Sequence, residues 1–550
     1  MDDGAARRAT LKGAAPTVGV TTAAEAGTAS PPSAPPTVTK WTILAAWAVL
    51  AVLAVLTSGL LIGPAGCGGA SPPPPNLILI ILDTVRADRL GCSGSAAGLT
   101  PNIDAFAERG VRFAQAYAQA PWTLPSVASI LTSRYPIQHG AAGRLNAFRL
   151  LEPEAVTLPE VFRDAGWTTG AIINVFFLTE TFGMTQGFES VDVTESHNNR
   201  EVRRAGPTTD AALAWIDSTS NPAGRSAAED APFFLMVHYF DAHLVYDPPQ
   251  PFRAAHADPR DAEGDDYLFG TVADMITLRQ GDAVVEGDLL PRLEQLYDGE
   301  VAYVDSEIGR LLDGLAARGL IENTVIAMVA DHGEEFGDHG GFEHGHTLYD
   351  ELIHVPLILS GPGTGGSRET APSGDSALDQ ATRPQERTVG ATVRLIDLAP
   401  TLCELAGIAP DPAFVGESLL PLIERVGADE EHGERVAGDD QAKPGGPGKL
   451  GADRPVFAEG NMWGASGASW RRGGEKIIWK PETETIELYA IEVDPLERND
   501  LAQTRPERVA ALTEELRLIA RTLAAGRRAG SAAPLTEEDR ERLRSLGYIK

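Results

Sequence analysis

Asn76-Leu-Ile-Leu-Ile-Ile-Leu-Asp83-Thr84-Val-Arg86-Ala-Asp88 contains a run of apolar residues that ends abruptly in an acid, a hydroxyl and further charge. Such a run predicts a buried central strand of a parallel sheet. Ligands of open α/β sheets bind at the carboxyl ends of the strands, so Asp83 stands where a metal-binding or catalytic carboxylate is expected. Taken alone, Asp83 is interpreted equally well as a helix cap or a turn residue.

A second run repeats this design further along the chain, in Val325-Ile-Ala-Met-Val-Ala-Asp331-His332-Gly333. Carboxylate and imidazole groups at two strand ends are ligands of divalent cations. The capping interpretation is much weaker for two such ends than for one. We therefore predict that Asp83, Asp331 and His332 bind the same ion.

Strands and helices alternate through the chain after residue 76, which predicts an α/β fold: a mostly parallel sheet flanked by helices. The expected strands are 76–82, 168–173, 233–240, 325–330 and 355–359. The expected helices are 101–109, one that starts at Thr123, 158–165 and 290–314. Short strands at 456–457, 476–480 and 487–490, with a charged helix near 506–525, predict a small α+β C-terminal subdomain.

The composition of successive segments predicts the domain organisation. Two stretches rich in Gly, Pro, Ser, Asp and Glu, at 361–388 and about 426–454, are typical of flexible surface insertions. The expected parts are a disordered segment 1–40, a transmembrane helix 41–63, a Pro-rich spacer 64–75, a catalytic domain 76–425, an insertion 426–454 and a C-terminal subdomain 455–550.

Residues 41–63 contain no charged side chain, and this length of apolar chain is sufficient to cross a bilayer. Arg7, Arg8, Lys12 and Lys40 precede the segment, and Arg86 is the first basic residue after it. The positive-inside rule then predicts a cytoplasmic N-terminus and an extracytoplasmic catalytic domain, periplasmic or at the cell surface. The alternatives are a cleaved signal, a lipid-modified Cys67 and a buried core helix.

The overall charge limits the kind of partner. The formal net charge of −31 opposes nucleic-acid binding, because phosphate backbones attract basic surfaces. An anionic substrate stays possible, since a bound metal ion reverses the local field. The three cysteines, Cys67, Cys92 and Cys403, form neither a disulfide framework nor the paired spacing of a structural zinc site.

Thr123 begins the segment Thr123-Leu-Pro-Ser126, and two interpretations of it are open. Threonine is a good helix N-cap, and proline is well tolerated in the first helical turn. Alternatively, the Thr123 hydroxyl lies at a helix N-terminus that favours anions, where a metal ion makes it a nucleophile.

These motifs, in their order along the chain, resemble the sulfatase family within the alkaline phosphatase superfamily. The resemblance covers about residues 74–549. Its blocks are 76–90, Thr123 to Pro136, the His-bearing loop His238 to Pro249, Asp331-His332-Gly333, His346 to Glu351, a later helix at 393–402 and the tail 542–549 with Leu546-Gly-Tyr-Ile.

The chain also departs from the family pattern. Members with a formylglycine nucleophile carry Cys or Ser, then Pro two residues later and Arg four residues later, where this chain has Thr123, Pro125 and Val127. Threonine cannot become formylglycine, so the resemblance points to relatives that use a threonine nucleophile on phosphoryl groups. Three further family positions, an acid, a Lys and a Lys-x-His segment, correspond here to Thr84, His346 and Asn174-Val-Phe176.

The resemblance implies a one-metal site with Asp83, Thr123, Asp331 and His332 as ligands of Ca²⁺, Mg²⁺, Mn²⁺ or Zn²⁺. Thr123 attacks a sulfuric or phosphoric ester of a glycan, lipid or small molecule, and His243 or His346 protonates the leaving oxygen. His238, His339 and His344 are structural histidines or additional ligands. The alternative functions are a phosphoryl-group transferase and a non-catalytic member that binds an anion or glycan.

Overall fold

The computed structural model describes residues 73–144, 147–194, 202–220, 231–262, 269, 271–279, 285–365, 387–431, 454–528, 530–545 and 548–549. Within these ranges, no helix is both long enough and apolar enough to cross a bilayer. The expected disordered segment 1–40, the expected transmembrane helix 41–63 and most of the spacer 64–75 lie outside the described residues.

A mostly parallel sheet forms the centre of the described fold, as predicted. Its strands lie in the order β11 (His354–Val355), β2 (Val111–Tyr117), β12 (Leu357–Ser360), β8 (Thr324–Ala330), β1 (Asn76–Leu82), β7 (Phe233–Tyr239), β5 (Thr168–Ile173) and β6 (Ser190–Val193), and β13 (Arg387–Arg394) pairs with β2. All pairs from β8 to β6 are parallel. The two short strands β11 and β12 pair antiparallel with their neighbours.

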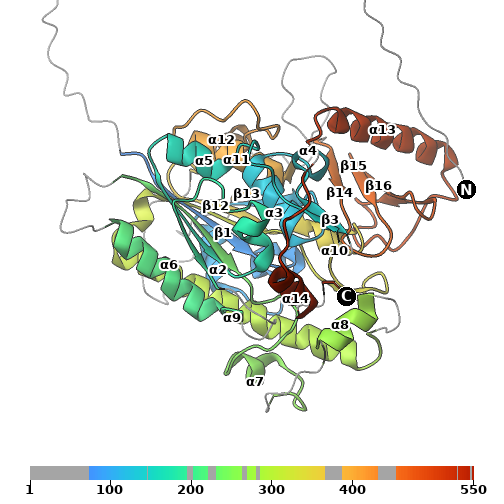
Figure 1. Ribbon diagram of the computed structural model, residues 1–550, viewed down its shortest axis with the longest axis horizontal. Coiled ribbons are helices and arrows are strands. Elements are labelled where there is room, and N and C mark those ends of the chain that lie inside the picture. The colour runs from blue at the N-terminus through green and yellow to red at the C-terminus, as the bar shows by residue number, and fades with distance from the viewer. Residues whose placement is uncertain are drawn as a thin grey trace, which may run out of the picture. The chain divides into compact units, whose positions relative to one another are not determined.

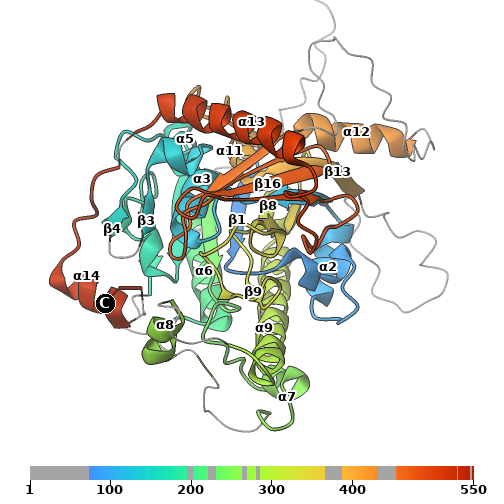
Figure 2. The same ribbon diagram turned by 90° about the vertical axis from the view of Figure 1, so that its right-hand side faces the viewer.

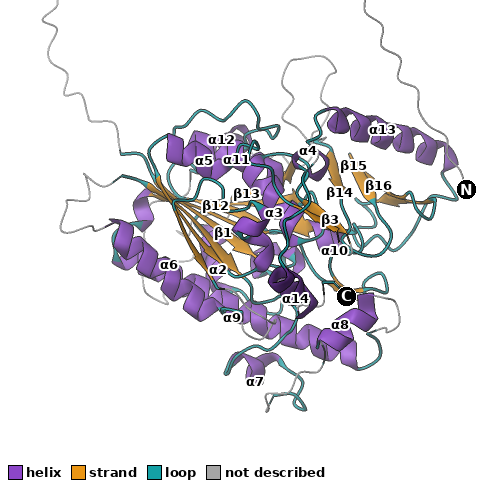
Figure 3. Cartoon of the chain, viewed as in Figure 1, coloured by secondary structure: helices purple, strands orange, loops and turns teal. Residues whose placement is uncertain are grey.

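Helices cover both faces of the sheet (Figures 1 and 3). On one face lie α2 (Pro101–Glu108), α6 (Ala205–Ser220) and α9 (Leu289–Ala317), and on the other lie α3 (Thr123–Thr132), α5 (Leu158–Asp164) and α11 (Leu398–Leu405). The apolar positions of α9 recur at helical spacing, so they form one buried stripe: Leu293, Leu296, Val304, Ile308 and Leu311. Both layers of helices thus bury the strands that carry the site.

Strand β1 is the centre of the core because every one of its residues is buried. It pairs in register with β8, so that Leu82 lies opposite Ala330, and with β7, so that Leu82 lies opposite Tyr239. The three strands therefore end at the same level, and the residues that follow them meet at one edge of the sheet.

Several local features differ from the sequence-based expectation. The expected strand 355–359 is divided at Pro356, which has no backbone N–H to donate to a ladder. β2 was not predicted because its half-buried sequence, Val-Arg-Phe-Ala-Gln-Ala-Tyr, has no apolar run. The expected helix at 393–402 begins only at Leu398, because β13 extends to Arg394.

The C-terminal subdomain contains an antiparallel sheet of β14 (Val456–Glu459), β15 (Ala468–Arg472), β16 (Glu475–Lys480) and β17 (Thr485–Ala490). Helix α13 (Pro506–Ala525) packs on it through Leu512 and Leu516, as the predicted α+β subdomain requires. Strand β15 was not predicted. The last helix, α14 (Glu537–Ser545), lies away from α13 (Figure 2).

The remaining α-helices and strands of the described residues complete the fold. They are α4 (Pro136–His139), α7 (Phe252–His256), α8 (Val272–Arg279), α10 (Asp350–Ile353), α12 (Leu420–Glu431), β3 (Ala142–Arg144), β4 (Ala147–Arg149), β9 (Glu335–Phe336) and β10 (Phe342–Glu343). Helix α12 extends into the expected insertion 426–454, and residues 432–453 of that insertion lie outside the described residues.

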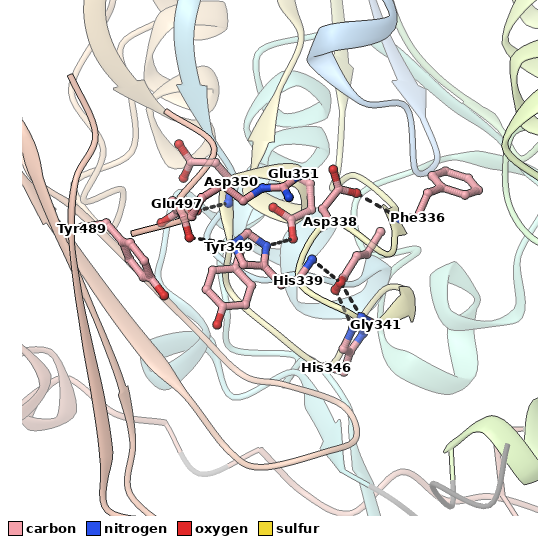
Figure 4. A network of polar contacts seen from close by, with 12 residues as sticks. Phe336, Asp338, His339, Gly341, His346, Tyr349, Asp350, Glu351, Tyr489 and Glu497 are labelled. Atoms are coloured by element: carbon pink, nitrogen blue, oxygen red, sulfur yellow. Dashed lines mark hydrogen bonds and ion pairs between the residues drawn. The ribbon is translucent and has the colours of Figure 1, made fainter. Parts of the chain in front are cut away.

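A buried ionic network joins the C-terminal sheet to the catalytic domain. Lys476 Nζ on β16 lies 2.7 Å from Asp350 Oδ1 and 2.9 Å from Glu497 Oε1. The Lys476 and Glu497 side chains are almost inaccessible to solvent, and that of Asp350 is 12% exposed. The Glu497 carboxylate also accepts a hydrogen bond from the Asp350 amide (2.6 Å; Figure 4). Removal of one partner from such a buried network would leave an uncompensated charge, which is strongly destabilising.

Candidate active site

Asp83, Asp331 and His332 form one fully buried cluster at the ends of β1 and β8. The register that pairs Leu82 with Ala330 makes Asp83 and Asp331 neighbours, as the two apolar runs predicted. One ligand atom from each of the three side chains lies within 4.8 Å of the others. His332 Nε2 is 3.5 Å from Asp83 Oδ1 and 3.5 Å from Asp331 Oδ2.

The atoms of this cluster suit a divalent cation. Asp83 Oδ1 and Asp331 Oδ2 are buried and have no hydrogen-bond partner, which is costly unless a cation lies between them. His332 donates its Nδ1–H to the carbonyl oxygen of Gly333 (2.9 Å), so its Nε2 lone pair faces the carboxylates. Two carboxylates and one imidazole are a donor set that Zn²⁺ and harder divalent ions accept.

The two carboxylates differ in their electrostatic environment. Burial raises the pKa of Asp331 to about 7, and the Asp83 carboxylate beside it contributes to this rise. Burial also opposes ionisation of Asp83, but the hydrogen bond from His238 and the nearby His243 lower the pKa of Asp83 below its usual value. A cation would favour the charged forms of both groups.

Thr123 lies at the same cluster, although it does not cap its helix as the sequence suggested. Trp122 is the N-cap of α3, Thr123 is the first helical residue, and no side chain makes a capping hydrogen bond. The Thr123 hydroxyl oxygen is instead 3.3 Å from His332 Nε2. The hydroxyl therefore faces the candidate metal ligands, at the end of α3 where backbone amides favour an anion.

His238 supports Asp83 from the adjacent strand, a role that sequence reasoning underrated. Its Nε2 lies 3.2 Å from Asp83 Oδ2, on the carboxylate oxygen opposite the one that faces His332. A partner of this kind orients a ligating carboxylate and is important to a metal site. The available signal was its position: His238 is the next-to-last residue of β7, which pairs with β1.

The loop after β7 carries His243 to the site. Thr84, which the resemblance places where the family has its second acid, donates its hydroxyl to the carbonyl oxygen of Ala242 (2.5 Å) and so joins the loop to the end of β1. Both Thr84 and Ala242 have positive φ, 58° and 82°, a conformation that costs energy in residues with a side chain and is common at functional sites. The loop is therefore held in a specific shape.

The His243 ring is fixed on several sides. Its Nδ1 donates to the carbonyl oxygen of Leu244 (2.6 Å), and the ring stacks on Phe240 at 4.3 Å between centroids. Burial lowers the pKa of His243, although the charge of Asp83 opposes that effect. The structure thus brings His243 to the predicted site with the orientation of its ring fixed.

His344 is a further histidine of the site that the sequence left undecided. Its ring lies 4.5 Å from that of His332 and 4.9 Å from that of His243. Its Nδ1 is 2.8 Å from the buried Glu334 carboxylate, which also accepts a hydrogen bond from Tyr246 (2.9 Å). Three imidazoles therefore gather beside the carboxylate cluster.

His346, which the sequence predicted as an alternative acid, contacts Glu335 and Trp463, which lie outside the carboxylate cluster. Its Nε2 lies 2.9 Å from Glu335 Oε2, and its ring stacks on Trp463 at 4.5 Å. Figure 4 draws it in the same polar network as His339, which lies between Glu351 Oε1 (2.7 Å) and the carbonyl oxygen of Glu497 (2.9 Å). These contacts raise the pKa of His339 to about 9 against the effect of burial, so His339 is a charged structural link.

Comparison with known proteins decides the family. A family model described as Sulfatase matches residues 75–408. The chain belongs to the sulfatase family. This membership confirms the predicted class of enzyme, an ester hydrolase, and the fold of the alkaline phosphatase-like sulfatases.

Relatives and solved structures agree with that assignment. Human iduronate 2-sulfatase is 28% identical over 392 residues, which are 61% of this chain and 70% of that protein. A protein solved in complex with its substrate D-glucosamine-2-N,6-O-disulfate has a TM-score of 0.58 at 20% identity, over 82% of this chain and 98% of that one. The phosphonate monoester hydrolase of Agrobacterium radiobacter has a TM-score of 0.58 at 20% identity, over 82% and 96%. At this identity, the two structures show the shared fold alone.

Proposed function

We propose that this member of the sulfatase family is a metal-dependent hydrolase that attacks sulfuric or phosphoric esters through the hydroxyl of Thr123. The observation that carries the proposal is the 3.3 Å approach of Thr123 Oγ1 to His332 Nε2, within the buried cluster of Asp83 and Asp331. Threonine cannot be converted to formylglycine, but its hydroxyl can itself be a nucleophile.

Asp83, Asp331, His332 and Thr123 would hold a divalent ion, Ca²⁺, Mg²⁺, Mn²⁺ or Zn²⁺. Such an ion supplies positive charge to the ester oxygens and makes the Thr123 hydroxyl easier to deprotonate. The N-terminal end of α3 contributes further positive potential toward the tetrahedral anion. His238 holds Asp83 in place through the hydrogen bond to Oδ2.

The residues of the site then have separate roles in the reaction. Thr123 loses its hydroxyl proton to water, and its Oγ1 forms a bond to phosphorus or sulfur in line with the leaving oxygen, whose bond to that atom breaks. His243 in its protonated form donates a proton to that oxygen, and His346 is the alternative acid. Water then releases the acid and regenerates the hydroxyl; transfer to an acceptor alcohol instead would make the enzyme a transferase.

Phosphoryl esters suit this site better than sulfate esters. A threonine sulfate lacks the easy breakdown that the aldehyde hydrate of formylglycine provides. The likeness to a phosphonate monoester hydrolase fits this choice. The protein solved with D-glucosamine-2-N,6-O-disulfate keeps sulfated glycans among the candidate substrates. We therefore propose an anionic ester of a glycan, lipid or small molecule as substrate.

A panel of esters tests this function. The purified protein, supplied with each candidate metal in turn, is expected to hydrolyse an aryl phosphate, a phosphodiester or a phosphonate monoester faster than an aryl sulfate. Thr123→Ala, prepared in parallel, reports any contaminating hydrolase. A protein that binds these anions but turns over none of them would contradict the proposal and support the non-catalytic alternative.

We further propose that residues 41–63 anchor the protein in a membrane, with residues 1–40 in the cytoplasm and the domain after about residue 70 outside. The support is the uncharged segment with its basic residues on the N-terminal side. Protease added to intact cells, or to spheroplasts where an outer membrane intervenes, is expected to digest the catalytic domain. Protection of the domain until the membrane is lysed would reverse the assigned topology.

A further inference from the structure

The end of the chain leaves the C-terminal sheet and returns to the catalytic domain. The amide of Leu150 donates to the carbonyl oxygen of Ser531 (3.1 Å), and the amide of Ala533 donates to that of Phe148 (2.9 Å). Figures 1 and 2 both draw α14 away from α13 and near β3. The tail is therefore held on the catalytic domain before its last residues are reached.

Those last residues are buried beside the start of α3. Leu543 and Ile549 belong to the main hydrophobic core, and the amide of Tyr548 donates to the carbonyl oxygen of Leu543 (2.8 Å). The Tyr548 ring packs edge-on against Phe177 at 4.8 Å, and Phe177 in turn contacts Trp122, the residue before Thr123. Packing against Phe177 thus fixes where the phenol ring lies.

The Tyr548 hydroxyl lies 3.5 Å from His243 Nε2, inside the protein. This distance is at the outer limit of a hydrogen bond, and such contacts in free enzymes often shorten when substrate binds. Because Nδ1 of His243 already donates to Leu244, the Nε2 of the neutral ring is an acceptor, and the phenol is the donor.

We propose that Tyr548, contributed by the C-terminal tail, is a positioning residue that sets the orientation of the His243 ring for proton transfer to the leaving oxygen. The role rests on the proposed function of His243. Before each turnover Nε2 takes up a proton from water, and during turnover it gives that proton to the leaving oxygen as the bond from this oxygen to phosphorus or sulfur breaks. The neutral ring that remains again accepts the Tyr548 hydroxyl and keeps its orientation. Tyr548 is thus the residue of the tail motif Leu546-Gly-Tyr-Ile to which we assign a role.

The activity test compares leaving groups. Tyr548→Phe keeps the ring that packs on Phe177 and removes only the hydroxyl. For an alkyl ester, whose leaving oxygen needs a proton, kcat is expected to fall roughly threefold to tenfold, the effect of one hydrogen bond. The 4-nitrophenyl ester of the same acid is expected to change little, and KM should change little for both esters.

Tyr489→Phe, a change of the same type in the C-terminal sheet, is the matched control and should leave both esters unaffected. Tyr489 is also buried and its hydroxyl contacts Glu487 (3.4 Å). An equal loss for both esters in Tyr548→Phe would indicate a merely structural role, and no loss for either would show that the phenol plays no part. Either result overturns the proposal.

A chemical-modification test does not depend on turnover. Diethyl pyrocarbonate modifies an accessible imidazole nitrogen, and His243 is only 3% exposed in the intact protein. Mass spectrometry should find His243 modified faster in Tyr548→Ala but as slowly as in the wild type in Tyr548→Phe, with the partly exposed His256 of α7 as the internal reference. Equal rates in wild type and Tyr548→Ala would refute the tail contact. Absence of esterase activity in the wild type would instead refute the proposed function, and the modification test would still decide the contact.

Discussion

Thr123→Ala is expected to lower kcat below detection while the protein remains folded. The hydroxyl is the only group of the described site that we assign as nucleophile, so its loss removes the covalent route. The fold should tolerate the change, because the Thr123 side chain makes no capping hydrogen bond and typical point substitutions cost about 1 kcal/mol. Steady-state kinetics together with the thermal midpoint measure the two effects separately.

Two conservative variants sharpen this result. Thr123→Ser should retain part of the activity, since the hydroxyl performs the attack and the methyl group does not. Thr123→Cys restores the family's nucleophile residue without the arginine at position 127, so conversion to formylglycine should be poor. Full activity in the alanine variant would remove Thr123 from the mechanism and favour direct attack by water. A gain of sulfatase activity in the cysteine variant would contradict the preference for phosphoryl chemistry.

Asp331→Asn is expected to abolish tight metal binding without unfolding the protein. The substitution removes one of the two buried carboxylates that each have one oxygen without a hydrogen-bond partner, Asp83 Oδ1 and Asp331 Oδ2. It also relieves the mutual repulsion of these carboxylates in the metal-free protein. In the wild type, an ion at a hundredfold excess over its Kd should stabilise the fold by about 2.7 kcal/mol. The variant should gain little, as measured by thermal unfolding with and without each ion.

Asp217→Asn is the matched control for the metal experiment. Asp217 is exposed and pairs with Arg318 on the helix layer, outside the candidate site. Its thermal response to added metal should equal that of the wild type, and so should the metal content after dialysis. If Asp331→Asn responded to the metal as the wild type does, the ion would bind elsewhere, and the cluster of Asp83, Asp331 and His332 would not be the metal site.

The predictable part of the site was the part carried by buried strands. The apolar runs before Asp83 and Asp331 predict buried parallel strands, and parallel neighbours in register end side by side. The sequence therefore predicted both the sheet and its carboxylates. It also suggested the position of Thr123, since a helix must begin there, although the residue that caps that helix is Trp122.

The rest of the site depends on contacts between distant segments. The importance of His238 follows from the pairing of β7 with β1, which a single apolar strand does not reveal. The place of His344 depends on the loop that follows the short strand β10. The place of Tyr548 depends on the route of the last twenty or so residues across another domain. β2 was missed for a similar reason: neighbours on both sides compensate for its weak apolar pattern.

Chemical trapping on Thr123 tests the central claim most directly. Wild-type protein is mixed with a phosphoryl or sulfuryl ester that it hydrolyses, quenched in acid within one turnover, and digested for mass spectrometry. The account predicts one phosphoryl or sulfuryl group on the peptide that contains Thr123, and none on that peptide from Thr123→Ala. The account would be contradicted if the wild type turned over the ester while Thr123 stayed unmodified at every quench time. This holds whether the phosphoryl or sulfuryl group was found on another residue or on none.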